Sequence, residues 1–202
     1  MPAGRKQMTK NIERAGTEFL KERINLMVIT NPEYYFRNLQ QRIVNGLETV
    51  DDTKFVMDEW ESNLGVGKTA IIENGSTFEK GGVGFSKVSG KKLPPSASQH
   101  RNLDNADGWS ATGVSLVIHT LNPHAPTVHM NVRYFEAGDI WWFGGGIDLT
   151  PYYGYQEDCV HHHSVLKAAC DRFDNSLYPQ FKKECDEYFY IKHREECRGV
   201  GG

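Results

Sequence analysis

The sequence is poor in the features that mark several common protein classes. It has only four cysteines among 202 residues, and no two of them form a Cys-x-x-Cys pair. A zinc knuckle is therefore a weak explanation, and we expect reduced thiols. No apolar run approaches the roughly 20 residues of a membrane-spanning helix, so no transmembrane segment is expected. The net charge of −3 argues against broad nucleic-acid binding, which needs a basic face.

The remaining composition is typical of one globular domain with a core. Hydrophobic residues make up 39% of the chain and charged residues 24%. Helical periodicity predicts helices at 9–29, 33–48, 156–173 and 178–197, whereas short apolar runs between glycine-rich turns predict strands in the middle. A proline-containing stretch at 94–108 is predicted to be a loop. This order of elements predicts an α+β domain with helices packed on an antiparallel sheet.

The stretch TVHMNVRYF, residues 127–135, alternates as a β-strand does. One set of side chains, beginning with Val128, is an ordinary core face. The other set presents an imidazole, an amide, a guanidinium and a phenyl ring, from His129, Asn131, Arg133 and Phe135. Donor groups of this kind suit an anionic ligand better than they suit a merely solvated face.

The preceding strand offers side chains that match. Ser115, Val117 and His119 share one face of SLVIHT, and the prolines at 123 and 126 mark a connection between the two strands. If the strands pair, then serine, histidine, asparagine and arginine side chains gather on one patch. We interpret the patch as a binding site, and a solvated sheet face is the alternative.

A stretch rich in aromatic residues and glycine, DIWWFGGGIDLTP, follows at 139–151. Its three glycines allow the backbone to kink or to approach a ligand closely. Asp148 lies between two aliphatic residues, where partial burial would suit it to act as a base or to accept from an N–H donor. A cap or turn former ahead of Pro151 is an equal alternative. At least one of the three aromatic residues at 141–143 is expected in the core.

Histidines raise the question of a metal ion. The run at 161–163 lies in a predicted helix, where adjacent side chains point about 100° apart and cannot converge. A site built from distant histidines is geometrically allowed but has no fixed spacing motif; its ligands would be His119, His129, His163 and His193. A histidine-ligated metal hydrolase or oxygenase is therefore one alternative function.

Five stretches carry a resemblance to a known family. They are TFEKGGVGFSKV (77–88), GVSLVIHTLNPHAPTVHMNVRYF (113–135), WWFGGGIDLTPYYGYQED (141–158), HHH (161–163) and LYPQFKKECDEYFYIKHREECRGVGG (177–202). Together they resemble oxygen-dependent coproporphyrinogen III oxidase. The resemblance implies an oxidase domain at 33–202, preceded by an N-terminal helical extension at 1–32. It also implies a large flat antiparallel β-sheet covered by helices on both faces, in a homodimer.

The resemblance further implies a reaction. Family members oxidatively decarboxylate the ring A and ring B propionates of coproporphyrinogen III to vinyl groups, with O2 as the electron acceptor, in haem biosynthesis. The product is protoporphyrinogen IX. No organic cofactor is implied. A divalent metal ion is left open, with the four histidines at 119, 129, 163 and 193 as its family-derived ligands.

Individual roles follow from the same resemblance. Arg133 would hold a propionate. Asp148 would lie under the macrocycle, where it would bond pyrrole N–H groups and help to deprotonate one. His129 would donate a proton. Ser115, Asn131 and the peptide at Val132 would complete the substrate contacts. A tetrapyrrole carrier without catalysis remains an alternative, and it would use the arginine without needing the aspartate.

The resemblance also bears on length and location. Family chains continue past the final RGVGG by roughly a third of their length, so we expect the sheet in this chain to be incomplete. We also expect the 202-residue form to be inactive or nearly so. The expected location is the cytoplasm, or the mitochondrial intermembrane space if the protein is eukaryotic.

Overall fold

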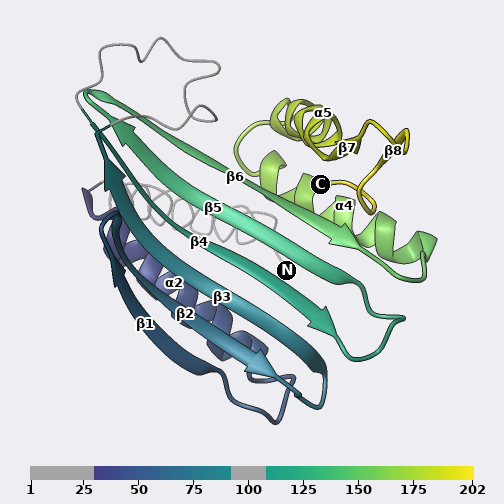
Figure 1. The fold of residues 1–202 in the computed structure, drawn as a ribbon. Coiled ribbons are helices and arrows are strands. Elements are labelled where there is room, and N and C mark those ends of the chain that lie inside the picture. The colour runs from purple at the N-terminus through teal and green to yellow at the C-terminus, as the bar shows by residue number, and fades with distance from the viewer. Residues whose placement is uncertain (1–29, 92–107) are drawn as a thin grey trace, which may run out of the picture.

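The structure is a computed structural model that describes residues 30–91 and 108–202 (Figure 1). In these ranges the chain forms α2 (Pro32–Leu47), β1 (Val56–Ser62), β2 (Gly65–Glu73), β3 (Phe78–Gly90), β4 (Trp109–Thr120), β5 (Thr127–Ala137), β6 (Ile140–Thr150), α4 (Gln156–Asp171), α5 (Leu177–Phe189), β7 (Tyr190–Ile191) and β8 (Glu196–Cys197). The predicted helix at 9–29 and almost all of the predicted loop at 94–108 lie outside the described residues. None of the described helices is long and apolar enough to cross a lipid bilayer.

The six long strands form one sheet in which each strand pairs with the strand before it, in the order β1-β2-β3-β4-β5-β6. Every pairing is antiparallel. The connection that the prolines at 123 and 126 predict lies at 121–126 and joins β4 to β5. The α+β class and the antiparallel sheet that the sequence predicts are therefore confirmed.

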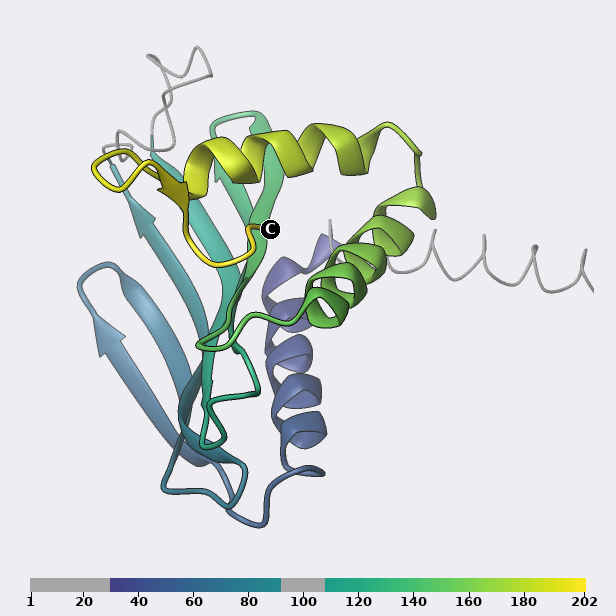
Figure 2. The same ribbon diagram turned by 90° about the vertical axis from the view of Figure 1, so that its right-hand side faces the viewer.

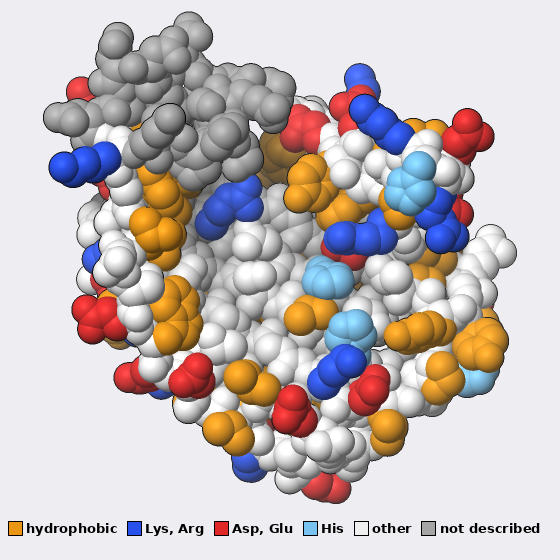
Figure 3. Space-filling view, viewed as in Figure 1, with side chains coloured by type: hydrophobic (Ala, Val, Ile, Leu, Met, Phe, Trp, Pro, Cys, Tyr) orange, Lys and Arg blue, Asp and Glu red, His pale blue; other side chains and the backbone are white. Residues whose placement is uncertain are grey.

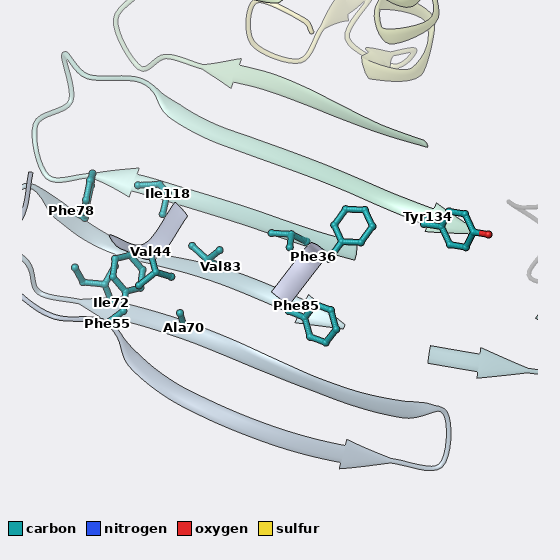
Figure 4. Close-up of a cluster of buried hydrophobic side chains, with 11 residues drawn as sticks. Phe36, Val44, Phe55, Ala70, Ile72, Phe78, Val83, Phe85, Ile118 and Tyr134 are labelled. Atoms are coloured by element: carbon teal, nitrogen blue, oxygen red, sulfur yellow. The ribbon is translucent and has the colours of Figure 1, made fainter. Parts of the chain in front are cut away.

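Helix α2 lies across one face of the sheet, against β3 and β4 (Figures 1 and 2). The side chain of Asn31 caps it by accepting from Tyr34 N at 3.0 Å, and Pro32 occupies the first turn, where its missing N–H is not needed. The helix predicted at 33–48 is thus confirmed. Its inner side joins the core shown in Figure 4, which contains Phe36, Val44, Phe55, Ala70, Ile72, Phe78, Val83, Phe85, Val114, Ile118 and Tyr134.

One buried amide fixes α2 to the strands beneath it. Gln40 is 3% exposed, and its Nε2 donates to Lys68 O at 2.6 Å and to Val83 O at 2.7 Å. Both acceptors belong to the sheet, so the hydrogen bonds hold the helix over β2 and β3. A buried amide that is satisfied in this way adds directional contacts to the apolar packing.

A buried carboxylate joins the segment after α2 to the turn between β2 and β3. Asp51 accepts hydrogen bonds from the backbone N–H groups of Thr53, Ser76, Thr77 and Phe78, over 2.8–3.1 Å. Burial acts to raise the pKa of Asp51, but the four backbone donors outweigh it and hold that pKa far below its usual range. The carboxylate therefore fixes the β2–β3 turn to the segment that follows the C-terminal end of α2.

The C-terminal region differs from the predicted helix at 178–197. Helix α5 ends at Phe189, and Tyr190 already takes an extended conformation. The chain then forms the small β7–β8 hairpin, in which Arg194 pairs with Glu196 and Glu195 has a φ of 56°. The charge-rich residues that suggest helix instead stabilise this turn. His193 thus lies in a turn and the last cysteine lies on a strand, so both helical assignments were wrong.

The last residues of the chain lie beside the outer edge of β6. Val200 N donates to Leu149 O at 2.9 Å, and His163 Nε2 on α4 lies 2.9 Å from Val200 O. This segment therefore connects α4 to the sheet. It also brings residues near position 200 to the end of β6 that carries Asp148.

Candidate active site

The sheet face opposite α2, which we call the open face, carries a floor of small side chains. The antiparallel register places Gly84, Ser115, Asn131 and Gly146 side by side across β3, β4, β5 and β6. Figure 3 shows this face as a hollow area with few coloured side chains in its middle. The expected helical cover of both sheet faces is not seen in the described residues, because α2 lies on the other face (Figure 2).

The patch inferred from the two strands is confirmed as an arrangement. Ser115 pairs with Asn131, and Val117 pairs with His129, so the polar side chains do share the open face. Arg133 lies on the same face and is exposed, and its Nη1 donates to Asn131 Oδ1 at 2.6 Å. The amide therefore orients the guanidinium over the floor.

Two members of the strand have other surroundings: Val132 lies on the opposite face, and Phe135 lies on the open face but is covered by neighbouring aromatic rings. Val132 points to the opposite face and packs against the core, so only its peptide remains for the substrate role that the resemblance implies. Phe135 is 6% exposed and stacks between Trp109 and Trp142, with ring centroids 5.4 and 4.4 Å away. Of the aromatic residues at 141–143, Trp142 is partly buried against the small cluster of Phe135 and Ala137, whereas the other two are exposed, so the expected core position is met only in part.

Asp148 is the most deeply buried polar side chain of the open face. It is 2% exposed and lies inside β6, directly opposite His129 on β5. Its Oδ2 accepts from Arg198 Nη2 at 2.7 Å, and its Oδ1 accepts from Thr150 Oγ1 at 3.4 Å. The carboxylate is therefore a buried member of an ion pair, and the alternative of a helix cap or turn former was wrong.

Sequence reasoning missed Arg198. Its guanidinium reaches Asp148 from the segment after β8, and its Cζ lies 4.5 Å above the ring of Phe189. The only signal in the sequence is an arginine ahead of the glycines of RGVGG, and nothing there identifies which acid it would meet. The contact joins two segments whose pairing no local pattern reveals.

His129 presents an imidazole to the open face, next to the buried carboxylate. Its side chain is 42% exposed, while its Nδ1 is buried 3.5 Å from Asp148 Oδ1. This distance is at the limit of a hydrogen bond, and Nδ1 has no other partner among the described residues. A histidine with one nitrogen near a carboxylate and its ring exposed has the arrangement of a group that exchanges protons with a ligand.

The four histidines of the metal hypothesis do not come together. His119 Nδ1 lies 3.3 Å from Thr127 Oγ1, His163 contacts the C-terminal segment, and His193 is exposed in the β7–β8 turn. No group of three or more His, Cys, Asp or Glu side chains in the described ranges is placed to hold a metal ion. As arranged here, these residues do not fit a shared ion, and the metal hypothesis stays an untested prediction.

His162, the middle histidine of the run on α4, lies near Asp148. Burial and the adjacent His163 lower the pKa of His162, while the charge of Asp148 acts in the opposite direction. Arg198 is the cation that forms an ion pair with this carboxylate among the described residues.

Taken together, the open face offers an exposed guanidinium, an imidazole supported by a carboxylate, and a floor of small residues. Two comparisons with known proteins bear on the family of the chain. Residues 31–202 match the family model described as coproporphyrinogen III oxidase. A curated relative from Francisella philomiragia subsp. philomiragia, named oxygen-dependent coproporphyrinogen-III oxidase, is 52% identical over 188 residues.

That match covers 86% of this chain and 61% of the relative, so the chain spans about three-fifths of the relative's length. The family match takes in all six strands of the sheet, the aspartate and its arginine partner. On the extent of that match and the identity to the relative, the chain belongs to the coproporphyrinogen III oxidase family.

Proposed function

We propose that this chain forms the substrate-binding part of an oxygen-dependent coproporphyrinogen III oxidase. The observation that carries the proposal is the placing of Arg133 and of the His129–Asp148 pair on one open sheet face. The substrate would be coproporphyrinogen III, whose ring A and ring B propionates would be converted to vinyl groups. The Francisella relative is named an oxygen-dependent oxidase of coproporphyrinogen III, which supports the choice of substrate.

The side chains divide the work in this proposal. Arg133 binds a propionate, a charge-assisted contact that contributes about 1.5–3 kcal/mol. Ser115 and Asn131 add hydrogen bonds beside it. The imidazole of His129 is exposed, so it faces the tetrapyrrole and transfers a proton to or from it. Asp148 is buried on the other side of the imidazole and orients it.

The electron balance needs no organic cofactor. Each propionate that becomes a vinyl group releases CO2, one proton and two electrons. Two such conversions therefore supply the four electrons that reduce one O2 to water. The protein's part is to bind and orient the ring and to hold the proton-transfer group against it.

The proposal is tested first by binding. The probe is coproporphyrin III, the oxidised and fluorescent form of the substrate, titrated with this chain. Wild type should quench its fluorescence, and Arg133→Ala should weaken binding by about 10- to 150-fold. The control is Arg42→Ala, an exposed arginine on α2 at the other face, which should bind as wild type does. Binding that is equal in all three proteins would contradict the proposal.

Turnover separates an enzyme from a carrier. Coproporphyrinogen III conversion would be followed with and without O2, as CO2 and as the fluorescence of the oxidised product. The assay uses this chain and the same chain extended by the C-terminal part of the Francisella relative. Asp148→Ala should reduce turnover far more than binding. An equal loss of both would favour the carrier.

Assembly and location belong to the same proposal. We expect a homodimer, which light scattering on the eluting protein would detect as twice the mass of one chain. We expect the cytoplasm as the location, with the mitochondrial intermembrane space as the alternative, and fractionation of cells that express the protein would distinguish them.

A further inference from the structure

The glycines inside the strands fall into two groups. Glycine weakens a strand, and it usually marks a place where another backbone or a ligand approaches closely. At some strand glycines a neighbouring backbone leaves no room for a side chain. A Cβ at Gly113 would lie 2.4 Å from Val132 O, and one at Gly145 would lie 2.3 Å from Asn131 O. A Cβ at Gly81 would lie 2.7 Å from Ile118 Cδ1 in the core.

Four strand glycines have no such explanation. A Cβ at one of them, Gly144, would make an ordinary contact of 3.6 Å with the Arg133 side chain, and the other three face more open space. A Cβ at Gly146 meets no atom within 4 Å, and the nearest atoms at Gly82 and Gly84 are carbonyl oxygens at 4.0 and 3.9 Å. Nothing in the part of the chain that the structure describes therefore requires glycine at these positions. All three point to the open face, because their cross-strand partners are Val117, Ser115 and Asn131.

These glycines lie among the residues of the proposed site. Gly84 and Gly146 stand in the same cross-strand row as Ser115 and Asn131, and Gly82 stands in the row of His129 and Asp148. Four strands separated by about 4.8 Å make this floor about 14 Å wide from β3 to β6. Such a floor suits a ligand with a broad face rather than a narrow chain.

We infer that Gly82 and Gly84 on β3 and Gly146 on β6 form a terrace, on either side of the Ser115 and Asn131 side chains, that receives the two edges of the tetrapyrrole ring. The inference rests on the proposed function and adds a structural reason why the site would accept a broad tetrapyrrole ring. The terrace sets how far the ring descends, and hence its distance from His129 and Arg133. A methyl group on the terrace lifts the ring away from both, and displacements of about 1 Å are enough to impair catalysis strongly.

Alanine substitutions on the intact 202-residue chain test the terrace. Gly84→Ala and Gly146→Ala should each weaken coproporphyrin III binding about tenfold, since a well-fitted contact tolerates an added methyl poorly. Their melting temperatures should equal or exceed that of wild type, because alanine fits the free space and restricts the unfolded chain. Gly82→Ala should behave in the same way.

Two controls separate the terrace from general effects. Gly46→Ala on α2 also adds a methyl into free space, but far from the open face, and should bind as wild type does. Gly81→Ala adds a methyl on the core side and should lower the melting temperature. A terrace variant that loses binding only together with a similar fall in melting temperature would count against the inference.

The outcomes also separate this inference from the proposed function. Terrace variants that bind as wild type does, while Arg133→Ala binds weakly, would overturn the terrace and leave the function standing. Failure of the wild-type chain to bind coproporphyrin III would overturn both.

Discussion

Arg198 Nη2 lies 2.7 Å from Asp148 Oδ2, although the two residues are 50 positions apart in the chain. The aspartate side chain is 3% exposed and the arginine side chain is 43% exposed. The arginine thus covers a carboxylate that would otherwise be buried against the sheet without a cation. The integrity of the open face depends on this contact from the C-terminal segment.

Replacing this arginine should destabilise the fold. Arg198→Ala leaves a buried carboxylate without its partner, and we expect the free energy of unfolding to fall by about 2 kcal/mol, because the arginine is only partly buried. The control is Arg194→Ala, whose ion pair with Glu196 is exposed on both sides and should contribute less than about 0.5 kcal/mol. Urea unfolding of the two variants checks the difference, and equal losses would contradict the role given to Arg198.

The Asp51 carboxylate at the turn between β2 and β3 should make stability depend on pH. Burial acts to raise the pKa of Asp51 and four backbone donors lower it further than that, so the folded pKa lies below the unfolded value of about 3.9. Its contribution is fully present above the unfolded pKa and is lost as the pH falls toward the folded one.

Asp51→Asn should therefore lower the urea midpoint at neutral pH, and its difference from wild type should shrink as the pH falls below about 4. Asp52→Asn, at the exposed neighbouring position, should keep the wild-type midpoint throughout. A difference between Asp51→Asn and wild type that stayed constant down to about pH 2 would rule out this account.

The amide that fixes α2 is open to a direct test. Gln40→Ala removes two hydrogen bonds to the sheet and leaves Lys68 O and Val83 O without that donor, so we expect a loss of about 2 kcal/mol. Gln41→Ala is the matched control, because Gln41 is exposed and bonds only Asn45 among the contacts found. Chemical unfolding should separate the two, and a loss below about 0.5 kcal/mol at position 40 would show that apolar packing alone holds the helix.

The separated histidines make a prediction about metal ions. Replacing His193, which is exposed in its turn, should leave both turnover and the metal content of the purified protein unchanged. In the chain extended by the C-terminal part of the Francisella relative, His129→Ala should reduce turnover about 100-fold or more, because it removes the proposed proton-transfer group. Metal analysis before and after chelation completes the test. If His193→Ala removed a bound ion, the four histidines would have to converge in a way that this structure does not show.

Local patterns predicted much of this molecule because the relevant contacts are local. The alternation around His129 and Arg133 follows from the geometry of a strand, and a short proline-containing turn made the pairing with Ser115 the simplest arrangement. Successive hairpins then placed the remaining strands in order. The features that were expected correctly all involve neighbours in sequence.

The features that escaped prediction depend on distant contacts. The ion pair of Asp148 requires a residue from beyond α5. That helix ends at Phe189 because the chain then forms a hairpin, although the charge pattern of the hairpin residues is typical of a helix. The choice between a buried acid and a cap at Asp148 could be made only after its partner was known. Likewise, glycines forced by a close backbone cannot be distinguished by sequence from glycines facing free space.

The order of the strands has a consequence for synthesis. Because each strand pairs with its predecessor, the sheet is able to grow hairpin by hairpin as the chain leaves the ribosome. The last strand of the six carries Asp148, whereas Arg198 is translated fifty residues later. The Asp148 carboxylate therefore stays hydrated in the nascent chain until the segment after β8 has been made.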